Sequence, residues 1–407
     1  MRILLSAYAC DPGAGTEPGN GWNWATHLAE AGHDVWVLTG VGDRSRRLEH
    51  ARGVKNLHIV DVPTPSLEGF LRYGGPGVYL HYLLWRRRSY RIAQRLVRSR
   101  HFDLAHHVTW GSLMWGSPLW RLGIPFVFGP VGGGQVAPRS LVRYLSRHRW
   151  SERLRARVFR PAMHLNLLAR AAILNAAVVF ATNTDTERLV RDLGAKSVYL
   201  LCDTAVPPGM LGASPSRLGA QSDIAILWLA RLLPRKGLPL ALHALSRIAR
   251  DVEWSCTLVG DGPLSPEVPG WLKRLRIDDR TTWLGGVPWS EVGHLYEEAD
   301  VFLFTSLRDA SGAQLYEAAA FGLPIVGLAH QGVADLIPDD VAVKVPVGDP
   351  DQTAQGLASA IEVLARAPEK RREMGLAARR FAERNTWAAR VQEAYSIIEF
   401  HLPSRTS

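Results

Sequence analysis

The chain has 407 residues, of which 47% are hydrophobic and 21% are charged. This composition excludes a disordered or fibrous protein, and the length allows two domains with large cores. The three cysteines (Cys10, Cys202 and Cys256) are far apart and form no CxxC pair, so neither a disulfide framework nor a zinc site is expected. Such cysteine usage suits a reducing cytoplasm.

The apolar run at the N-terminus ends at Asp11. This is too early for a secretory signal, so we expect the run to be a buried strand. No later apolar stretch approaches the ~20 residues that span a bilayer. The sequence therefore predicts a cytoplasmic protein, soluble or peripheral to the inner face of the membrane.

The formal net charge is +10, and two arginine clusters supply much of the positive charge. The clusters are Arg86, Arg87, Arg88, Arg91, Arg95, Arg98 and Arg100, and then Arg143, Arg147, Arg149, Arg153, Arg155, Arg157 and Arg160. A solvated helix face, an anionic membrane surface and a nucleic-acid site are the three interpretations that stay open. Leu83, Leu84, Trp85 and Tyr90 interleave with the first cluster, which favours peripheral membrane contact through residues 86–100. No nucleic-acid motif accompanies the charge, so no nucleic-acid partner is expected.

The first half alternates apolar strands with helices, which is typical of a parallel sheet with right-handed crossovers. The expected strands are residues 2–8, 34–39, 57–62, 104–108, 125–129 and 178–182. A glycine-rich turn follows the first strand and leads into a helix at 22–31. This half is therefore predicted to be Rossmann-like.

The same pattern restarts after the turn-rich junction at 207–209. The second set of expected strands is 224–229, 253–259, 281–284, 301–305, 325–328 and 341–344. We predict an N-terminal domain over 1–206, a C-terminal domain over 207–385 and a final helix within 386–407 that packs back across the domains. Ligands of open parallel sheets bind beyond the carboxyl ends of the strands, so a cleft between two such domains is the expected site.

The strongest constellation of polar residues follows the expected strand 301–305. A small-residue loop with Asp309 leads into a helix that starts near Ala313 and stops at Gly322. The free N–H groups at the helix start suit a phosphate. Glu317, about one turn further, can reach hydroxyls on the group that carries the phosphate.

Two other strand-end loops strengthen this pattern. Arg231 and Lys236 lie in the loop after 224–229, and two cations beside a helix start can neutralise a diphosphate without Mg²⁺. Residues 260–263, Gly-Asp-Gly-Pro, form another turn where the backbone can approach a nucleobase.

These motifs, in this order, resemble the retaining glycosyltransferases of family 4, which have the GT-B fold. The segments are Ala230-Arg231 to Lys236-Gly237, Gly260 to Pro263, Leu284-Gly285 to Val287-Pro288, Ala299 to Leu303, and Asp309 to Glu317. The resemblance covers nearly the whole chain and is most specific over 224–336. It implies an α/β protein of two Rossmann-like, doubly wound parallel-sheet domains with a cleft between them, and a nucleotide-diphosphate-sugar donor with UDP favoured.

The resemblance also implies roles for single residues in the C-terminal domain. Arg231 and Lys236 would bind the diphosphate, and Glu317 would bind the ribose. The turns at Gly262 and Val287 would flank the base. The donor phosphate and sugar would contact Ala310, Ser311, Gly312, Ala313, Gln314 and Leu315.

Asp309 is the point where the sequence departs from the family. The resemblance implies that this catalytic candidate faces the donor sugar, but the family usually has glutamate here, with a side chain longer by one methylene. The identity of the donor sugar therefore transfers less securely than diphosphate binding.

The N-terminal half supplies two kinds of candidate on strand ends. His106 or His107 lies near the place where the family has a histidine facing the donor sugar, and the pattern does not decide between them. A structural hydrogen bond is the alternative role for either histidine.

Glycines are the other candidates in this half. Gly15 belongs to a turn that resembles the family's glycine loop, where donor phosphate and acceptor approach the backbone. Gly132, Gly133 and Gly134 follow another strand and are expected to border the acceptor site.

No DxD-type metal site stands out, so we predict that no metal or other cofactor is required. Arg231, Lys236 and helix amides would meet the charge on the leaving group. The resemblance implies retention at the anomeric carbon, whereas the acceptor stays open between a glycan, a lipid-linked glycan and a secondary metabolite. The alternatives are a nucleotide-sugar 2-epimerase of the same fold and a sugar- or lipid-binding scaffold without turnover.

Overall fold

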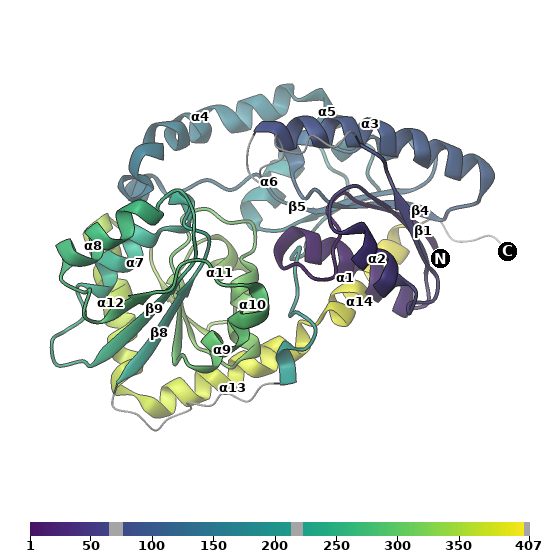
Figure 1. Cartoon of the computed structure of the whole chain (residues 1–407). Helices are drawn as coiled ribbons and strands as arrows, with labels where there is room; N and C mark the ends of the chain where they lie inside the picture. The colour runs from purple at the N-terminus through teal and green to yellow at the C-terminus, as the bar shows by residue number, and fades with distance from the viewer. Residues whose placement is uncertain (65–75, 213–222, 403–407) are drawn as a thin grey trace. The chain divides into compact units, whose positions relative to one another are not determined.

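The computed structural model of the chain describes residues 1–64, 76–212 and 223–402. These residues form two compact units, and Figure 1 labels many of their helices and some of their strands. The first unit combines Met1–Gly134, Arg160–Thr204 and Trp387–Ser407, and the second combines Gln135–Phe159 and Ala205–Thr386. The chain therefore passes between the units several times.

The first unit holds a seven-stranded sheet in the order β3-β2-β1-β4-β5-β6-β7. Its strands are β1 (Arg2–Ala7), β2 (Asp34–Thr39), β3 (Leu57–Asp61), β4 (Leu104–Thr109), β5 (Phe126–Val131), β6 (Val178–Ala181) and β7 (Val198–Leu200). Every pairing is parallel, and Ile3 of β1 lies opposite both Val35 and Leu104. β4, β5 and β6 are buried along their whole length, as parallel strands covered on both faces are. The strand order reverses between β1 and β4, so their carboxyl ends form the switch point of this sheet.

The helices of the first unit come from both ends of the chain. They are α1 (Thr16–Glu30), α2 (Arg44–Ala51), α3 (Pro76–Ser99), α5 (Leu167–Leu174), α6 (Thr184–Asp192) and α14 (Trp387–His401). α14 packs on α1, where the Trp387 and Trp24 rings meet edge to face with centroids 5.9 Å apart. Buried aromatic contacts of this kind attach the end of the chain to the first unit.

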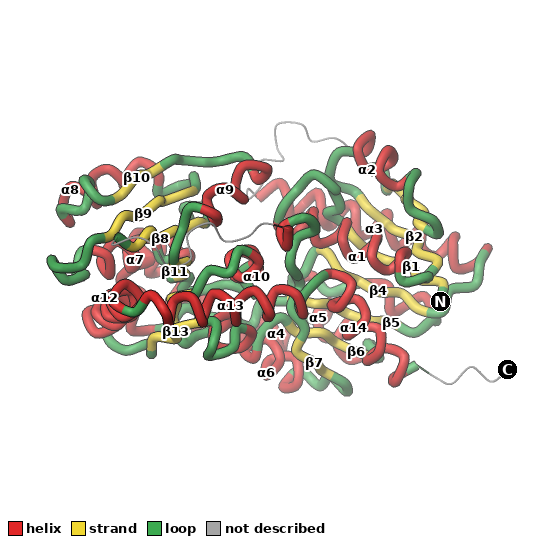
Figure 2. The backbone as a smooth tube through the Cα atoms, turned by 90° about the horizontal axis from the view of Figure 1, so that it is seen from below, coloured by secondary structure: helices red, strands yellow, loops and turns green. Residues whose placement is uncertain are grey.

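The second unit holds a six-stranded parallel sheet in the order β10-β9-β8-β11-β12-β13, and Figure 2 shows the strands of both sheets in yellow. Its strands are β8 (Ile224–Leu229), β9 (Trp254–Val259), β10 (Thr281–Trp283), β11 (Val301–Phe304), β12 (Ile325–Leu328) and β13 (Ala342–Val345). Its helices are α7 (Leu238–Leu245), α8 (Val268–Leu275), α9 (Val292–Glu297), α10 (Ala313–Ala320), α11 (Gln331–Leu336), α12 (Pro350–Arg366) and α13 (Pro368–Arg384). The order reverses between β8 and β11, which places the second switch point at their carboxyl ends.

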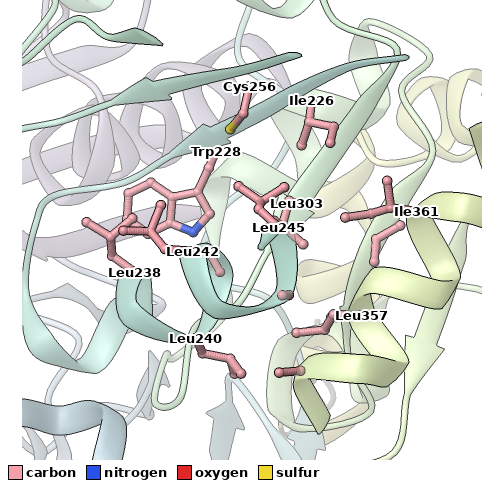
Figure 3. Packing of buried hydrophobic residues seen from close by; sticks show 14 of the residues in the cluster. Ile226, Trp228, Leu238, Leu240, Leu242, Leu245, Cys256, Leu303, Leu357 and Ile361 are labelled. Atoms are coloured by element: carbon pink, nitrogen blue, oxygen red, sulfur yellow. The ribbon is translucent and has the colours of Figure 1, made fainter. Parts of the chain in front are cut away.

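The core of the second unit lies between its sheet and the helices α7 and α12. Figure 3 shows Trp228 of β8 beside Leu238 and Leu242 of α7, and all three side chains are buried. The indole N–H of Trp228 donates to the hydroxyl of Thr305 at 3.0 Å, so the one polar atom of this ring is satisfied inside the core.

Residues 135–159 belong to the second unit although they lie within the predicted N-terminal domain of 1–206. They include the short helix η3 (Arg139–His148) and the first part of α4 (Arg149–Leu165). Leu141 and Val142 of η3 are buried in the core of the second unit. The predicted boundary differs from the observed units here because apolar burial, rather than chain order, decides where this segment packs.

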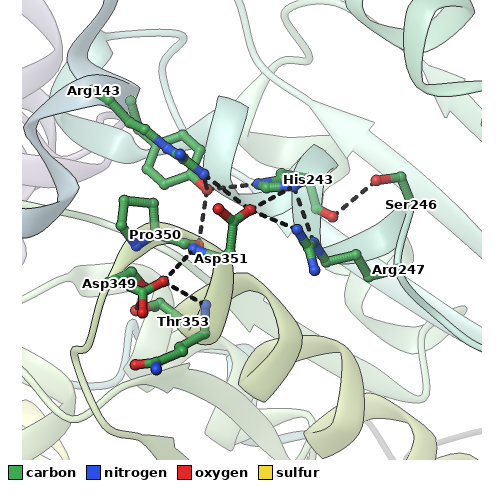
Figure 4. Close-up of polar contacts among 10 residues, drawn as sticks. Arg143, His243, Ser246, Arg247, Asp349, Pro350, Asp351 and Thr353 are labelled. Atoms are coloured by element: carbon green, nitrogen blue, oxygen red, sulfur yellow. Dashed lines mark hydrogen bonds and ion pairs between the residues drawn. The ribbon is translucent and has the colours of Figure 1, made fainter.

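A polar cluster completes the attachment of η3 to the second unit (Figure 4). The hydroxyl of Tyr144 lies 2.6 Å from Nδ1 of His243 on α7. Arg143 and Arg247 both donate to Asp351 at the start of α12, at 3.3 and 2.6 Å. Asp351 thus joins η3, α7 and α12 through one carboxylate.

The prediction of two Rossmann-like parallel sheets is confirmed. Each expected strand is present in the structure, with ends that differ by a few residues. β7 was not predicted, because it is only three residues long and its last residue is exposed, so its sequence carries no clear apolar pattern.

Leu303 and Leu376 provide a matched pair of substitutions in the second unit. Leu303 on β11 is buried in the core, whereas Leu376 on α13 is 42% exposed. We expect Leu303→Ala to lower the free energy of unfolding by ~2–5 kcal/mol because it leaves a cavity. Leu376→Ala should change it by less than ~0.5 kcal/mol. Urea unfolding followed by circular dichroism measures both, and equal losses would contradict this assignment of the core.

Candidate functional site

The loops after β8 and β11 meet at the switch point of the second sheet. Gly237 has a φ of 72°, and a Cβ there would lie 2.1 Å from the carbonyl oxygen of Thr305, so only glycine permits this approach. The amides of Leu307 and Arg308 donate to the carbonyl oxygen of Arg235 at 2.8 and 3.2 Å. Backbone contacts therefore hold the two loops together.

Lys236 and Asp309 face each other across these loops. The ammonium group of Lys236 donates to Oδ2 of Asp309, and both side chains are largely buried. Arg235 lies 3.4 Å from Oδ1 of Asp309, and the hydroxyl of Ser306 lies 3.2 Å from Oδ2. Burial lowers the pKa of Lys236, Asp309 opposes this change, and Arg235 and Arg231 add to the lowering.

The carboxylate of Asp309 stays ionised in this setting. Burial by itself would raise the pKa of Asp309, but Lys236 and Arg235 outweigh burial and lower the pKa to about 2. Asp309 is therefore no proton donor at neutral pH. Arg235 and Lys236 both contact the carboxylate of Asp309, and Arg231 lies in the same loop, so this switch point is rich in cations and suits an anionic ligand.

Gln331 supports Asp309 from the start of α11. Its side-chain oxygen accepts from the amide N–H of Asp309, and its side-chain nitrogen donates to the carbonyl oxygen of Val136, both at 2.9 Å. The neighbouring Arg308 forms an ion pair with Glu152 of α4 at 2.9 Å. The segment 135–159 therefore supports the Asp309 loop at two separate points.

Helix α10 begins directly after this loop without a side-chain cap. Its N-cap residue is Gly312, with a φ of 80°. The six residues assigned to the donor phosphate and sugar are ordered here: Ser311, Gly312 and Leu315 are buried, and Ala310, Ala313 and Gln314 are half-buried. The side-chain oxygen of Gln314 is buried and has no hydrogen-bond partner within the described residues. The uncapped start of α10 suits an anion.

Glu317 lies one turn into α10 and is held by a tyrosine. The hydroxyl of Tyr296 on α9 donates to Oε2 of Glu317 at 2.8 Å, and the Tyr296 ring stacks on Phe321. Burial raises the pKa of Glu317, and the hydrogen bonds from Tyr296 and Trp289 oppose this change. The hydrogen bond from Tyr296 therefore fixes the orientation of the Glu317 carboxylate.

The turn after β9 packs directly against the loop after β8. A Cβ at Gly260, which has a φ of 139°, would lie 1.9 Å from the carbonyl oxygen of Ala230. The amide of Gly262 donates to the carboxylate of Asp261 at 2.7 Å. Val287 is half-buried in the turn after β10. The amide of Gly260 donates to the carbonyl oxygen of Gly285, and this hydrogen bond joins the turn after β10 to the turn after β9. The predicted diphosphate and base loops thus lie side by side.

Both candidate histidines of β4 are fully engaged inside the first unit. His106 contacts the Tyr395 hydroxyl through Nδ1 at 3.1 Å and the Gly129 carbonyl through Nε2 at 2.7 Å. His107 contacts the Ser6 hydroxyl through Nδ1 at 3.2 Å, and its Nε2 reaches the Trp110 carbonyl at 3.1 Å. Burial lowers the pKa of His106 to about 3 and that of His107 to about 4. Both rings are therefore neutral at physiological pH and make structural hydrogen bonds.

The glycines assigned to the acceptor follow β5. Gly132 is tied to Gly111 and Leu113 by backbone hydrogen bonds. A Cβ at Gly134 would lie 2.7 Å from the backbone of α6, which explains why that residue is small. Gly133, with a φ of 138°, and Gly15, before the first residue of α1, are only half-buried.

Glu17 occupies the switch point of the first sheet, a position that was not predicted from the sequence. It lies in the first turn of α1, and its Oε1 accepts from the amide of Gly111 in the loop after β4 at 2.7 Å. Burial raises the pKa of Glu17 to about 7, the Gly111 hydrogen bond opposes this change, and Asp203 adds to it. Next to Gly111 in the chain, the Trp110 ring stacks with Tyr8 and with Tyr79. A carboxyl with a pKa near neutrality therefore lies close to a cluster of aromatic rings.

The peripheral membrane contact expected at 86–100 stays a prediction, and the structure shows how the side chains of this segment are distributed. On α3 the arginines Arg87, Arg91 and Arg95 are exposed, but Trp85 is buried against Tyr8. Leu84 is exposed, whereas Leu83 and Tyr90 are half-buried. Of these four apolar residues, Trp85 is the one that packs fully inward, so the ring of Trp85 is not exposed to a membrane surface. In the second cluster, the side chain of Arg147 lies outside the described residues.

Over 1–64, 76–212 and 223–402, no group of three or more histidine, cysteine or acidic side chains is arranged to hold a metal ion. The Asp-Pro-Asp sequence at 349–351 caps α12 through Asp349 and binds arginines through Asp351. No helix in the described part of the chain combines the length and apolar character needed to cross a membrane.

The raised pKa of Glu17 predicts how the free energy of unfolding depends on pH. Because its pKa is raised on folding, the folded state keeps the proton while the unfolded state loses it, and the wild-type protein loses stability as pH rises from ~4.5 to about 7. We expect Glu17→Gln to remove this loss, so its stability relative to wild type should increase over that window and level off above it.

Urea unfolding at a series of pH values measures this effect. Glu30→Gln, at an exposed position in the same helix, is the matched control and should show a constant difference. A flat difference for Glu17→Gln as well would contradict the raised pKa.

Comparison with known proteins identifies two family domains. Residues 215–381 match the family described as glycosyl transferases group 1, and residues 22–200 match the glycosyl transferase 4-like domain. D-inositol 3-phosphate glycosyltransferase of Kineococcus radiotolerans is 25% identical over 447 residues, which cover 100% of this chain and 97% of that protein.

Solved structures resemble the whole chain. Sucrose-phosphate synthase of Thermosynechococcus elongatus has a TM-score of 0.71 at 18% identity, and the match covers 98% of each chain. Anabaena HepE in complex with UDP and glucose has a TM-score of 0.61 at 16% identity, covering 98% of this chain and 99% of that one. The two family matches and the shared architecture show that the chain is an enzyme of the group 1 glycosyltransferases, with the GT-B fold.

Proposed function

We propose that this glycosyltransferase moves a sugar from a UDP-sugar to a hydroxyl of a glycan, a lipid-linked glycan or a secondary metabolite, with retention and without a metal ion. The observation that carries the proposal is the cationic switch point of the second unit, where Lys236 is buried against Asp309 with Arg235 and Arg231 alongside. The complex of Anabaena HepE with UDP and glucose supports the same donor class.

The diphosphate is the group that this charge suits best. Lys236 offers a desolvated ammonium, and Arg231 is exposed in the same loop with a planar guanidinium that can bind two phosphate oxygens. Together with the uncapped start of α10, they stabilise the charge that develops on the leaving nucleotide. These groups perform the role that a divalent cation has in other transferases, which is why we propose metal independence.

The remaining donor contacts follow from the same loops. Glu317, oriented by Tyr296, accepts from the ribose hydroxyls. Asp309 is ionised and accepts from hydroxyls of the donor sugar while it remains paired with Lys236. The turns at Gly262 and Val287 flank the base. Because Asp309 is shorter than glutamate and is held by Gln331, it requires a sugar that comes close to the loop.

All the donor contacts proposed above lie in the second unit. We therefore assign the acceptor to the first unit. Of the four glycines predicted to contact donor or acceptor in this unit, Gly15 and Gly133 are half-buried and let an acceptor approach the backbone. His106 and His107 keep the switch point of this unit rigid rather than exchanging protons. In the proposed reaction the departing phosphate takes the acceptor proton, so no separate base is required. We propose a cytoplasmic location, peripheral to a membrane where the acceptor is lipid-linked.

Nucleotide binding is the first test. At a concentration of about 100 times Kd, a bound nucleotide stabilises the native state by about 2.7 kcal/mol. We expect UDP to raise the melting temperature equally with and without EDTA, because the cationic loops bind it directly. Differential scanning fluorimetry with UDP, GDP, ADP and dTDP measures the shift.

Variants of the cationic loops complete this test. Lys236→Ala and Arg231→Gln should each remove most of the UDP shift, and Arg231→Gln leaves the Lys236 pair in place. Lys273→Ala, an exposed lysine on α8, is the matched control and should keep the full shift. If no nucleotide shifts the melting temperature, the proposed nucleotide site is refuted. If EDTA abolishes the shift, the proposed metal independence is refuted.

The stereochemistry of transfer is the second test. We expect the α-anomeric proton signal of a UDP-α-sugar donor to be replaced by an α-linked product signal, because attack occurs on the face that the phosphate leaves. Proton NMR of the reaction from its first minutes distinguishes the two anomers through their coupling constants. A β-linked first product would overturn retention without affecting nucleotide binding.

A further inference from the structure

The first three turns of α4, residues 149–159, expose apolar side chains in a row. Trp150 is 67% exposed, Leu154 is 63% exposed and Val158 is 49% exposed. Residues four apart lie on one face of a helix, so these three form a single stripe, here called the α4 stripe. Isolated exposed apolar residues are ordinary on protein surfaces, but a contiguous row of this kind marks an interaction site.

The opposite face of the same turns packs onto the second unit. Glu152 and Phe159 are buried, and Glu152 pairs with Arg308 of the donor loop at 2.9 Å. The guanidinium of Arg155 lies over the Phe159 ring, 4.5 Å from its centroid. The helix is thus held by contacts on one side, and the α4 stripe is not needed to attach it.

Arginines border the α4 stripe along its length. Arg149, Arg153 and Arg157 each precede a residue of the stripe, and all three are exposed. The guanidinium of Arg153 lies over the Trp150 ring, 5.3 Å from its centroid. Glu152 is the one acidic residue in this part of the sequence, and it is turned inward. The exposed face therefore combines an apolar centre with a purely cationic border.

The apolar centre and the cationic border together indicate which kind of partner fits this face. A second copy of the chain docking through the same stripe would bring the two arginine rows together and repel itself. A nucleic acid would match the arginines but not three adjacent apolar side chains. An anionic bilayer matches both, because its phosphates accept the arginines and its acyl boundary accepts the apolar residues.

We propose that the α4 stripe docks the second unit on an anionic lipid surface. Trp150, Leu154 and Val158 enter the boundary between headgroups and acyl chains, and Arg149, Arg153 and Arg157 lie at the phosphates. The membrane contact is thereby assigned to α4 instead of α3, where Trp85 and Tyr82 are buried. This surface is independent of nucleotide binding and of the acceptor's identity.

Co-sedimentation with vesicles tests the proposal on the full chain. Wild-type protein should bind phosphatidylglycerol-containing vesicles and bind pure phosphatidylcholine much more weakly. The variant Trp150→Ser, Leu154→Ser, Val158→Ser should bind anionic vesicles at least about tenfold more weakly, because binding scales with the buried apolar area. Replacing Arg149, Arg153 and Arg157 with glutamine should weaken it by about fivefold for each charge.

The matched control removes three arginines from α3. Arg87→Gln, Arg91→Gln, Arg95→Gln makes the same change in net charge on an exposed helix face, and it should keep most of the binding. Binding lost equally in this variant would assign the effect to net charge and overturn the docking role of α4. Unchanged binding in the serine variant, or no binding of wild type to anionic vesicles, would overturn it as well.

A second measurement reports insertion directly. The native cysteines Cys10, Cys202 and Cys256 are buried, so Leu154→Cys can be labelled with an environment-sensitive fluorophore, with Arg87→Cys as the control site. Anionic vesicles should shift the emission of the label at 154 to the blue and leave that at 87 unchanged. A dimer in light scattering that the serine variant dissociates would show that a second copy covers the stripe, and would refute the proposal.

Discussion

The buried ion pair between Lys236 and Asp309 is the interaction on which the switch point of the second sheet depends. Removing an ammonium from water is costly, and a single carboxylate offsets that cost only if its geometry is good. Here Ser306 and Arg235 also contact the carboxylate. Two cations, Lys236 and Arg235, therefore lie at one carboxylate. Under the proposed function a diphosphate adds negative charge at this point, so ligand binding would also stabilise the loops.

The position of Asp309 in turn depends on a segment from the other half of the sequence. Gln331 bonds the amide of Asp309 on one side and the carbonyl of Val136 on the other, and Glu152 holds Arg308. Residues 135–159 thus form part of the support of the Asp309 loop, and Tyr144 and Arg143 attach that support to α7 and α12. Under the proposed function, a change in this segment can alter donor affinity without contacting the donor.

The sequence predicted the two parallel sheets because alternating apolar strands and helices leave few other arrangements. It also identified Lys236, Asp309 and Glu317 as candidates, since each belongs to a short local motif. It missed Gln331, whose contacts lie 22 and 195 residues away, and Glu17, whose partner Gly111 lies 94 residues away. Trp85 was misjudged for the same reason: its spacing among arginines indicates helix, but only its contact with Tyr8 shows which face is inward.

The two switch points differ in charge, and this difference constrains the acceptor. At the second sheet Lys236 and Arg235 surround Asp309, whereas at the first sheet α1 contributes the carboxyl of Glu17 and β4 contributes two neutral histidines. Asp203 also acts on Glu17 with negative charge. An anionic group would be repelled there, and above pH 7 the repulsion would increase because Glu17 ionises. Under the proposed function, the end of the acceptor that enters these loops therefore carries hydroxyls rather than phosphate or carboxylate. A lipid-linked glycan carries negative charge at its phosphate. When such an acceptor binds, its phosphate must lie away from Glu17.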